Sequence, residues 1–182
     1  MNAPPVLVTP RLTLRPQVEA DAETLHPALA DPVQMRWWSR APLSSLQETR
    51  AYMAVPEDYG WRRWIVTRTG EDRALGWIAT GLKRQGGVSE IGYILAREAQ
   101  GQGIAREAVS AVIDRLFAEG NRRVFADTDP DNDASNRLLE RLGFRREGLL
   151  RAEWETHIGV RDSLLWGLLR EEWVSSSAST RA

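Results

Sequence analysis

The polar turn Gln100-Gly101-Gln102-Gly103-Ile104-Ala105 is the stretch whose residue types and spacing best suit chemistry. It lies between an apolar segment and a helical one. Its glycines and Ala105 leave little side-chain bulk, so a ligand can approach the backbone closely, and a positive φ costs glycine little. The first N–H groups of a helix have no intrahelical partner, and the helix dipole makes that end positive. The turn therefore predicts an anion site, most simply for a phosphate, although an ordinary strand–turn–helix corner has the same pattern.

The spacing of the turn excludes two other phosphate-binding loops. The chain has no Gly-x-x-x-x-Gly-Lys-Ser/Thr motif, which excludes the nucleoside-triphosphate loop. The Gly-x-Gly-x-x-Gly dinucleotide pattern also fails, because Arg106 occupies the position of the third glycine. A nucleotide-binding regulatory domain is also disfavoured, because the loop lacks a phosphate-binding lysine.

Several motifs in order resemble the GNAT acyltransferases. Gln100, Gly103 and Ala105 fit that family's Arg/Gln-x-x-Gly-x-Gly/Ala signature, and residues 131–136 with 142–144 resemble its next strand–helix unit. The opening 9–16 and closing 162–166 resemble the branch related to the ribosomal-protein N-acetyltransferases, the RimJ/RimL-like proteins. The resemblance implies an α+β fold: one mixed sheet flanked by helices, with two parallel central strands that splay apart around the cofactor.

The resemblance also implies acetyl-CoA as co-substrate and no metal. Backbone N–H groups of the turn would cradle the pyrophosphate, the strand before it would face the pantetheine, and two arginines would reach phosphates. The two arginines, Arg106 and Arg137, have an alternative role as solvated helix surface. Asn132, a further candidate for the pantetheine, has an alternative role in an Asx turn. The expected cofactor-binding residues are Ile94, Leu95, Gln100, Gly101, Gln102, Gly103, Ile104, Ala105, Arg106, Asn132 and Arg137.

The catalytic candidates are carried over residue by residue. Glu90 matches a glutamate that serves as general base in some family members, with Glu153 as its competitor. Leu139 occupies the position of the family's usual tyrosine. The resemblance to the ribosomal branch implies that Ser135 lies near the pantetheine, which makes it the candidate partner of the leaving thiolate. Each candidate has a structural alternative: a solvent-facing strand residue for Glu90, one alternating polar face for Glu153, and a helix cap for Ser135.

The acceptor is expected to be a primary amine, either a protein N-terminal α-amino group or a small amine. Trp37, Trp38 and Trp154 lie in segments that border the acceptor site in the family, and they can form an apolar wall. His157 can orient the acceptor, or it is a solvated loop residue. The rival to an enzyme is a non-catalytic module that binds acyl-CoA as a sensor.

The elements that must position these residues follow from periodicity and turn chemistry. Asp21 is expected to cap the first helix, and serine capping boxes to open the second. Glycines are expected to end the later helices. The predicted strands are 12–15, 61–66, 75–82, 89–95, 124–126, 144–154 and 163–169, and the predicted helices are 21–30, 46–55, 104–119 and 135–142.

Composition limits the protein class. With 182 residues, the chain is expected to form one acyltransferase domain over 1–182, ordered over about 6–173 with a flexible tail at 174–182. Net charge is −1, so nothing favours nucleic acid or an anionic membrane, and the absence of cysteine excludes disulfides and a thiol nucleophile. We expect a cytoplasmic monomer or homodimer.

Overall fold

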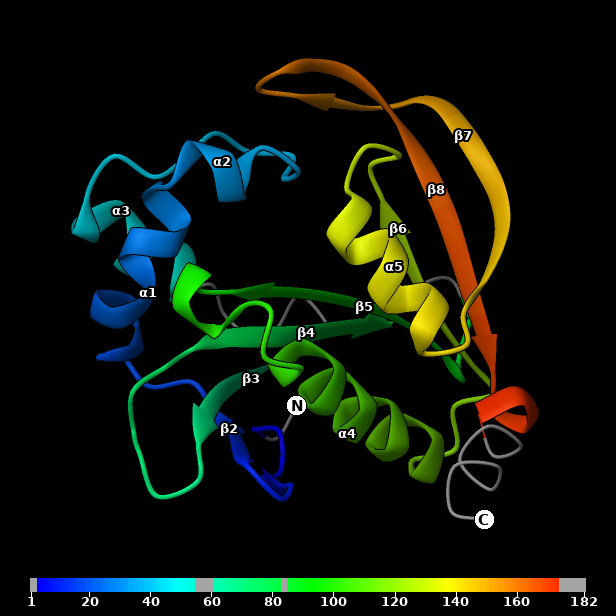
Figure 1. The fold of residues 1–182 in the computed structure, drawn as a ribbon, viewed down its shortest axis with the longest axis horizontal. Coiled ribbons are helices and arrows are strands. Elements are labelled where there is room, and N and C mark those ends of the chain that lie inside the picture. The colour runs from blue at the N-terminus through cyan, green and yellow to red at the C-terminus, as the bar shows by residue number, and fades with distance from the viewer. Residues whose placement is uncertain (1–2, 55–60, 83–84, 174–182) are drawn as a thin grey trace.

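The structure, a computed structural model, describes residues 3–54, 61–82 and 85–173. Eight strands form one sheet in the order β1-β2-β3-β4-β5-β6-β8-β7, and every neighbouring pair is antiparallel except β5–β6, which is parallel (Figure 1). The predicted mixed sheet is therefore confirmed. The strands are β1 (Leu7–Val8), β2 (Leu12–Pro16), β3 (Trp61–Arg68), β4 (Gly76–Leu82), β5 (Val88–Leu95), β6 (Arg123–Thr128), β7 (Arg145–Thr156) and β8 (Gly159–Leu169).

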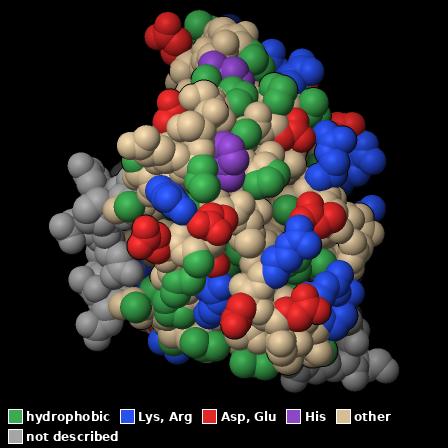
Figure 2. Space-filling view, turned by 90° about the vertical axis from the view of Figure 1, so that its left-hand side faces the viewer, with side chains coloured by type: hydrophobic (Ala, Val, Ile, Leu, Met, Phe, Trp, Pro, Cys, Tyr) green, Lys and Arg blue, Asp and Glu red, His purple; other side chains and the backbone are tan. Residues whose placement is uncertain are grey.

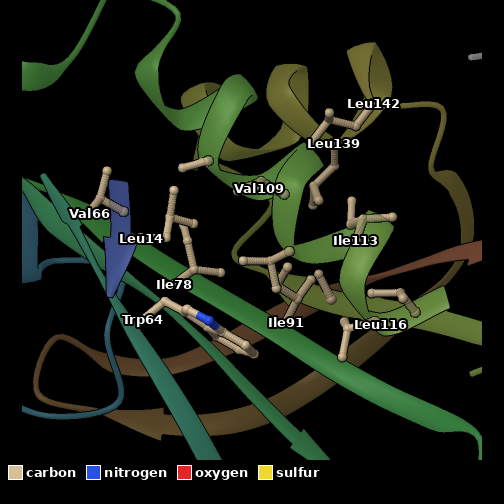
Figure 3. Packing of buried hydrophobic residues seen from close by; sticks show 14 of the residues in the cluster. Leu14, Trp64, Val66, Ile78, Ile91, Val109, Ile113, Leu116, Leu139 and Leu142 are labelled. Atoms are coloured by element: carbon tan, nitrogen blue, oxygen red, sulfur yellow. The ribbon is translucent and has the colours of Figure 1, made fainter. Parts of the chain in front are cut away.

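Two helices cover one face of this sheet. Figure 3 shows Leu14, Ile78 and Ile91 of the sheet facing Val109 and Ile113 of α4. All five side chains are almost fully buried, and each contributes about 1.5–3 kcal/mol relative to an exposed position. The two helices are α4 (Ile104–Ala118) and α5 (Asp133–Arg141).

Three short helices cover the opposite face of strands β2–β5. Leu25 and Leu29 of α1 pack with Ile65, Trp77 and Ile94, which alternate along their strands with residues of the first cluster. The predicted sheet is thus buried on both sides at its centre. The three helices are α1 (Asp21–Ala30), α2 (Pro32–Met35) and α3 (Leu46–Met53).

Helix ends follow the predicted signals with one correction. Ser45 caps α3 by accepting the Glu48 N–H at 3.1 Å, whereas the predicted end of this helix at Val55 lies outside the described residues. Asp21 was expected to be a cap, but it is the first residue of α1 and follows the N-cap Ala20. Its buried carboxylate instead receives the Arg15 guanidinium at 2.7 Å and accepts the Val18 N–H at 2.8 Å.

The parallel pair β5–β6 separates part-way along its length. The two strands are paired from Val88 opposite Arg123 to Glu90 opposite Phe125, and the ladder ends there. Beyond Glu90, β5 is paired only with β4, while β6 continues against β8 as far as Thr128. The expected splay is confirmed, and it opens directly after Glu90.

The C-terminal hairpin extends beyond the core. The last strand begins at Gly159, four residues before the predicted start at Ser163. The prediction missed these first residues because they are exposed or half-buried and show no apolar alternation. The partner strand β7 is irregular between Leu150 and Trp154, and Ala152 has a φ of 52°. The tail 174–182 lies outside the described residues.

The surface carries charges of both signs. Figure 2 shows Lys and Arg side chains interspersed with Asp and Glu side chains over the side of the molecule that α1 and α3 occupy. No helix in the described ranges is long and apolar enough to cross a membrane.

Candidate active site

A cleft of about 1480 Å³ opens where β5 and β6 part. One wall comes from α2, α3, β3 and β4, and the other from β6, α5 and the β7–β8 hairpin. The turn before α4 closes one end. The cleft therefore brings the candidate cofactor turn, the candidate base and the acceptor wall into a single space.

The turn before α4 is shaped for an anion. Gly101 and Gly103 have φ values of 72° and 75°, the left-handed region that glycine tolerates. A Cβ at Gly101 would meet nothing within 4 Å, so the turn is open to a ligand. Among the described residues, no group accepts a hydrogen bond from the N–H groups of 101–106, and α4's first intrahelical bond is Glu107 N–H to the Gly103 carbonyl. These N–H groups fit a pyrophosphate.

Side chains hold this turn from behind. The Arg11 guanidinium pairs with Glu107 at 2.6 Å and donates to the Gln102 carbonyl at 3.1 Å, and Arg68 donates to the Gln102 side chain at 2.8 Å. Gln100 donates to the Leu95 carbonyl at 3.0 Å. Gln100 and Gln102 therefore fix the shape of the turn, and its backbone N–H groups are left without an acceptor among the described residues.

Glu90 lies at the point where β5 and β6 separate. It lines the cleft, and only 9% of the residue is exposed, so it is not the solvent-facing strand residue considered as the alternative. The residue opposite it in the parallel ladder is Phe125, the last pair before the strands part. A carboxylate in this position faces the space where a substrate between the strands would react.

Tyr93 is a polar residue of the cleft that sequence reasoning used only as part of the strand pattern. Its hydroxyl is buried and makes no hydrogen bond of ordinary geometry with any described group. Burial raises the pKa of Tyr93 to about 12, and the neighbouring Ser135 side chain acts in the opposite direction. Tyr93 on β5 and Ser135 on α5 therefore place two neutral hydroxyl groups together across the splay.

The start of α5 separates the roles of its polar residues. Asn132 is the N-cap, and its side-chain oxygen accepts the Ser135 N–H at 3.3 Å. The alternative role of Ser135 as the helix cap is therefore wrong, because the cap is the side chain of Asn132. Arg137 lines the cleft but is exposed and paired with Asp133 at 2.8 Å, and Arg106 is an exposed lining residue.

The predicted acceptor residues divide into two groups. Trp37, Trp38 and Trp154 line the cleft, and Trp38 packs edge-on against Trp77 with ring centroids 6.1 Å apart. Glu153 and His157 are exposed and are not among the residues that line it. Trp154 and Glu153 are adjacent on β7, and successive side chains of a strand point to opposite faces, so one lines the cleft and the other does not.

An ion pair stands on the β6–β8 side of the cleft. Arg161 donates to both carboxylate oxygens of Asp129 at 2.7 and 2.9 Å, and also pairs with Asp131. Burial alone would raise the pKa of Asp129, but hydrogen bonds from Arg161 and the Asp131 N–H outweigh it, so the pKa is lowered. The pair ties the loop after β6 to the hairpin.

Comparison with known proteins agrees with this arrangement. Residues 11–145 match the family model of the acetyltransferase (GNAT) domain. The chain is 31% identical to the uncharacterized N-acetyltransferase p20 of Bacillus licheniformis over 92% of this chain and 97% of p20. A GNAT-family acetyltransferase from Bacillus anthracis superposes with a TM-score of 0.83 at 25% identity, covering 92% of this chain and all of that one.

A further structure is RimL, a ribosomal L7/L12 α-N-protein acetyltransferase, in complex with coenzyme A. It has a TM-score of 0.78 at 21% identity, and the match covers 91% of this chain and 98% of RimL. This likeness shows a shared fold, whereas the family model and the p20 match assign the family. The chain therefore belongs to the GNAT family of acetyltransferases.

Proposed function

We propose that this protein transfers the acetyl group of acetyl-CoA to a primary amine by direct attack in a ternary complex. The observation that carries the proposal is the end of the β5–β6 ladder at Glu90, in the same cleft as the free N–H groups of the turn. The pyrophosphate would bind these N–H groups, and the pantetheine would run between the splayed strands along Ile94 and Leu95. The turn thus positions the thioester, and Glu90 receives the proton.

The reaction needs one bond formed and one broken. The amine nitrogen attacks the thioester carbonyl carbon, the C–N bond forms, the C–S bond breaks, and coenzyme A leaves as a thiolate. The proton lost by the nitrogen passes to Glu90, directly or through water. Holding both substrates in one cleft removes much of the entropic barrier.

Two hydroxyl groups are assigned to stabilise the leaving thiolate by hydrogen bonding. Leu139 is fully buried and takes no part, whereas Tyr93 and Ser135 meet beside the expected path of the pantetheine. A phenol with a pKa of about 12 is neutral at pH 7 and can donate a hydrogen bond to sulfur. We assign Tyr93 and Ser135 together to this role, and Asn132 and Arg137 to binding of the cofactor.

Free-CoA release with a panel of amines tests the function. The panel contains N-terminal peptides, polyamines and aminoglycosides, and calorimetry measures binding of coenzyme A in parallel. Acetylation of at least one amine, with loss of turnover in Glu90→Gln, supports the enzyme. Binding of acetyl-CoA with no transfer to any amine would instead indicate the sensor module.

A further inference from the structure

Arg63 is a cation in the cleft that lacks a carboxylate partner among the described residues. Its Nη1 group donates to the Gln17 side chain at 2.6 Å and to the Met53 carbonyl at 3.2 Å, both neutral acceptors. Its guanidinium carbon lies 5.0 Å from the centroid of the Trp77 ring and 5.8 Å from that of Tyr52. Burial lowers the pKa of Arg63, which an arginine tolerates while remaining charged.

The adjacent arginine shows the contrast. Arg62 points to the other face of β3, where its two terminal nitrogens donate to both carboxylate oxygens of Glu119 at 2.8 and 2.7 Å. Arg62 and Glu119 thus form a structural ion pair that neutralises the charge of Arg62. Arg63 has been partly removed from water without such compensation, which is costly unless a ligand supplies the negative charge. Its Nε and Nη2 groups donate to no described acceptor and match a carboxylate in geometry.

The sheet places Arg63 and Glu90 on the same face. Arg63 is opposite Ala79, which is opposite Gly92, and Glu90 is two residues from Gly92 on β5. A Cβ at Gly92 would meet nothing within 4 Å, so the floor between the two charged residues is open. Strand spacing and rise put their Cα atoms about 12 Å apart. Both side chains are on the same face of the sheet, so one small molecule can contact both.

The charge of this wall is one-sided. Of the described residues that line the cleft ahead of Glu90 in the chain, Arg36 and Arg63 are charged and none is Asp or Glu. A polyamine with its second cation against this wall would meet arginine, whereas the other carboxylates that line the cleft, Asp127, Asp129 and Asp162, belong to the β6–β8 side. A molecule with an amine at one end and an anion at the other would meet Glu90 and Arg63 in the right order.

We propose that the acceptor is a primary amine bearing a carboxylate a few bonds from the nitrogen, and that Arg63 is the residue that selects it. This inference rests on the proposed function. The chemistry is shared by a free α-amino acid and by a peptide whose first or second residue is acidic. The rings of Trp77 and Tyr52 lie beside the guanidinium, and Gln17 and the Met53 carbonyl hold its Nη1 group, which leaves Nε and Nη2 for a ligand.

Matched acceptor pairs test the proposal on the whole protein. Free glutamate is compared with its diamide, an Ala-Glu peptide with an Ala-Gln peptide (both C-terminally amidated), and spermidine is a third arm. We expect the carboxylate member of one pair to have a kcat/KM about 10-fold or more above its amide, as a charge-assisted hydrogen bond provides. Whichever pair shows the preference identifies the source of the carboxylate.

Variants then assign the preference to Arg63. Arg63→Gln should abolish it, mainly through KM for the acceptor, Arg63→Lys should retain part of it, and KM for acetyl-CoA should stay unchanged. Arg62→Gln is the matched control and should keep the preference. Equal rates within both pairs, faster acetylation of spermidine, or an intact preference in folded Arg63→Gln would overturn the inference while leaving the acetyltransferase intact. Failure to acetylate any amine would instead remove the proposed function.

Discussion

The two ends of the cleft are built in different ways. At the proposed cofactor end, six consecutive N–H groups and two left-handed glycines are available to a ligand, and side chains such as Arg11 support the turn. At the acceptor end, the surface consists of side chains from α2, α3, β3 and β4, with Trp77 and Arg63 at its centre. A site made of backbone N–H groups does not depend on side-chain identity, so different proteins can use it for the same phosphate. A site made of side chains changes with the sequence, so the acceptor can differ from one protein to the next.

The proposed reaction centre, Glu90, lies between these two ends, and its loss should have the largest effect. Glu90→Gln keeps the size of the side chain but removes the proton acceptor, so kcat should fall by about 10²- to 10⁴-fold. Affinity for coenzyme A, measured by calorimetry, should barely change.

Glu153→Gln is the matched control for Glu90→Gln. Glu153 is exposed and outside the lining of the cleft, so its substitution should leave kcat near that of the unaltered protein. Near-native turnover in Glu90→Gln would assign the proton to water, and a large loss in Glu153→Gln would return the role to that residue.

Substitution in the turn tests the backbone end directly. Gly103→Glu adds a carboxylate to the turn that would hold the phosphate, and like charges near 4 Å repel by about 4 kcal/mol at an effective dielectric constant of 20. We expect affinity for coenzyme A to fall at least about 100-fold. Calorimetry showing unchanged affinity in the folded variant would exclude this turn as the phosphate site.

Gly103→Ala separates charge from backbone strain. An alanine at a φ of 75° is strained, and its Cβ would lie 3.4 Å from the Arg11 guanidinium. Stability should therefore fall by about 1 kcal/mol, with a much smaller loss of affinity than in the glutamate variant. Equal losses in the two variants would mean that strain, rather than charge, governs the turn.

The difference between the two ends also explains what the sequence could predict. The strand, the glycine turn and α4 are continuous in the chain, so local spacing sufficed for them, and the family motifs supplied the splay. Tyr93 and Arg63 could not be assigned, because Ser135 and Trp77 reach them only through tertiary packing. The signal that could have identified Tyr93 was its place in the central strand, three residues after Glu90.

The acceptor-side predictions from β7 show a narrower limit. Alternation along 151–155 predicted one polar face, and Arg151, Glu153 and Glu155 are all exposed. Trp154 lines the cleft while Glu153 does not, as expected for adjacent residues of a strand. What the alternation could not predict is the irregularity of β7 between Leu150 and Trp154, with Ala152 at positive φ.

The paired hydroxyl groups should have an intermediate effect. Tyr93→Phe and Ser135→Ala should each lower kcat by about 10-fold, as expected for loss of one hydrogen bond of about 1–1.5 kcal/mol. If both act on the same sulfur, the double variant should lose less than the product of the two. Because the pKa of Tyr93 is about 12, the phenol stays protonated below that pH, so the Tyr93→Phe effect should be constant across neutral pH.

Asn132→Ala is the stability control for that pair. Asn132 caps α5, so its loss should cost about 1 kcal/mol of unfolding free energy, whereas Ser135→Ala should leave the melting temperature nearly unchanged. An equal drop in melting temperature with normal turnover in Ser135→Ala would make Ser135 structural and leave the thiolate to Tyr93 or water.

The smallest effect is expected from a side chain at the backbone-built end. The Arg137 side chain is 65% exposed and is already paired with Asp133, so water and that carboxylate screen its attraction for a phosphate. Exposed pairs contribute about 0.2–1 kcal/mol, so Arg137→Gln should raise KM for acetyl-CoA only about 2- to 5-fold. The increase should shrink further at high salt, because the Debye length falls to about 3 Å at 1 M. Arg106→Gln is the matched variant on α4 and should behave alike. A salt-insensitive loss of 100-fold or more in either variant would show that arginine, rather than the N–H groups of the turn, holds the phosphates, and the contrast between the two ends of the cleft would disappear.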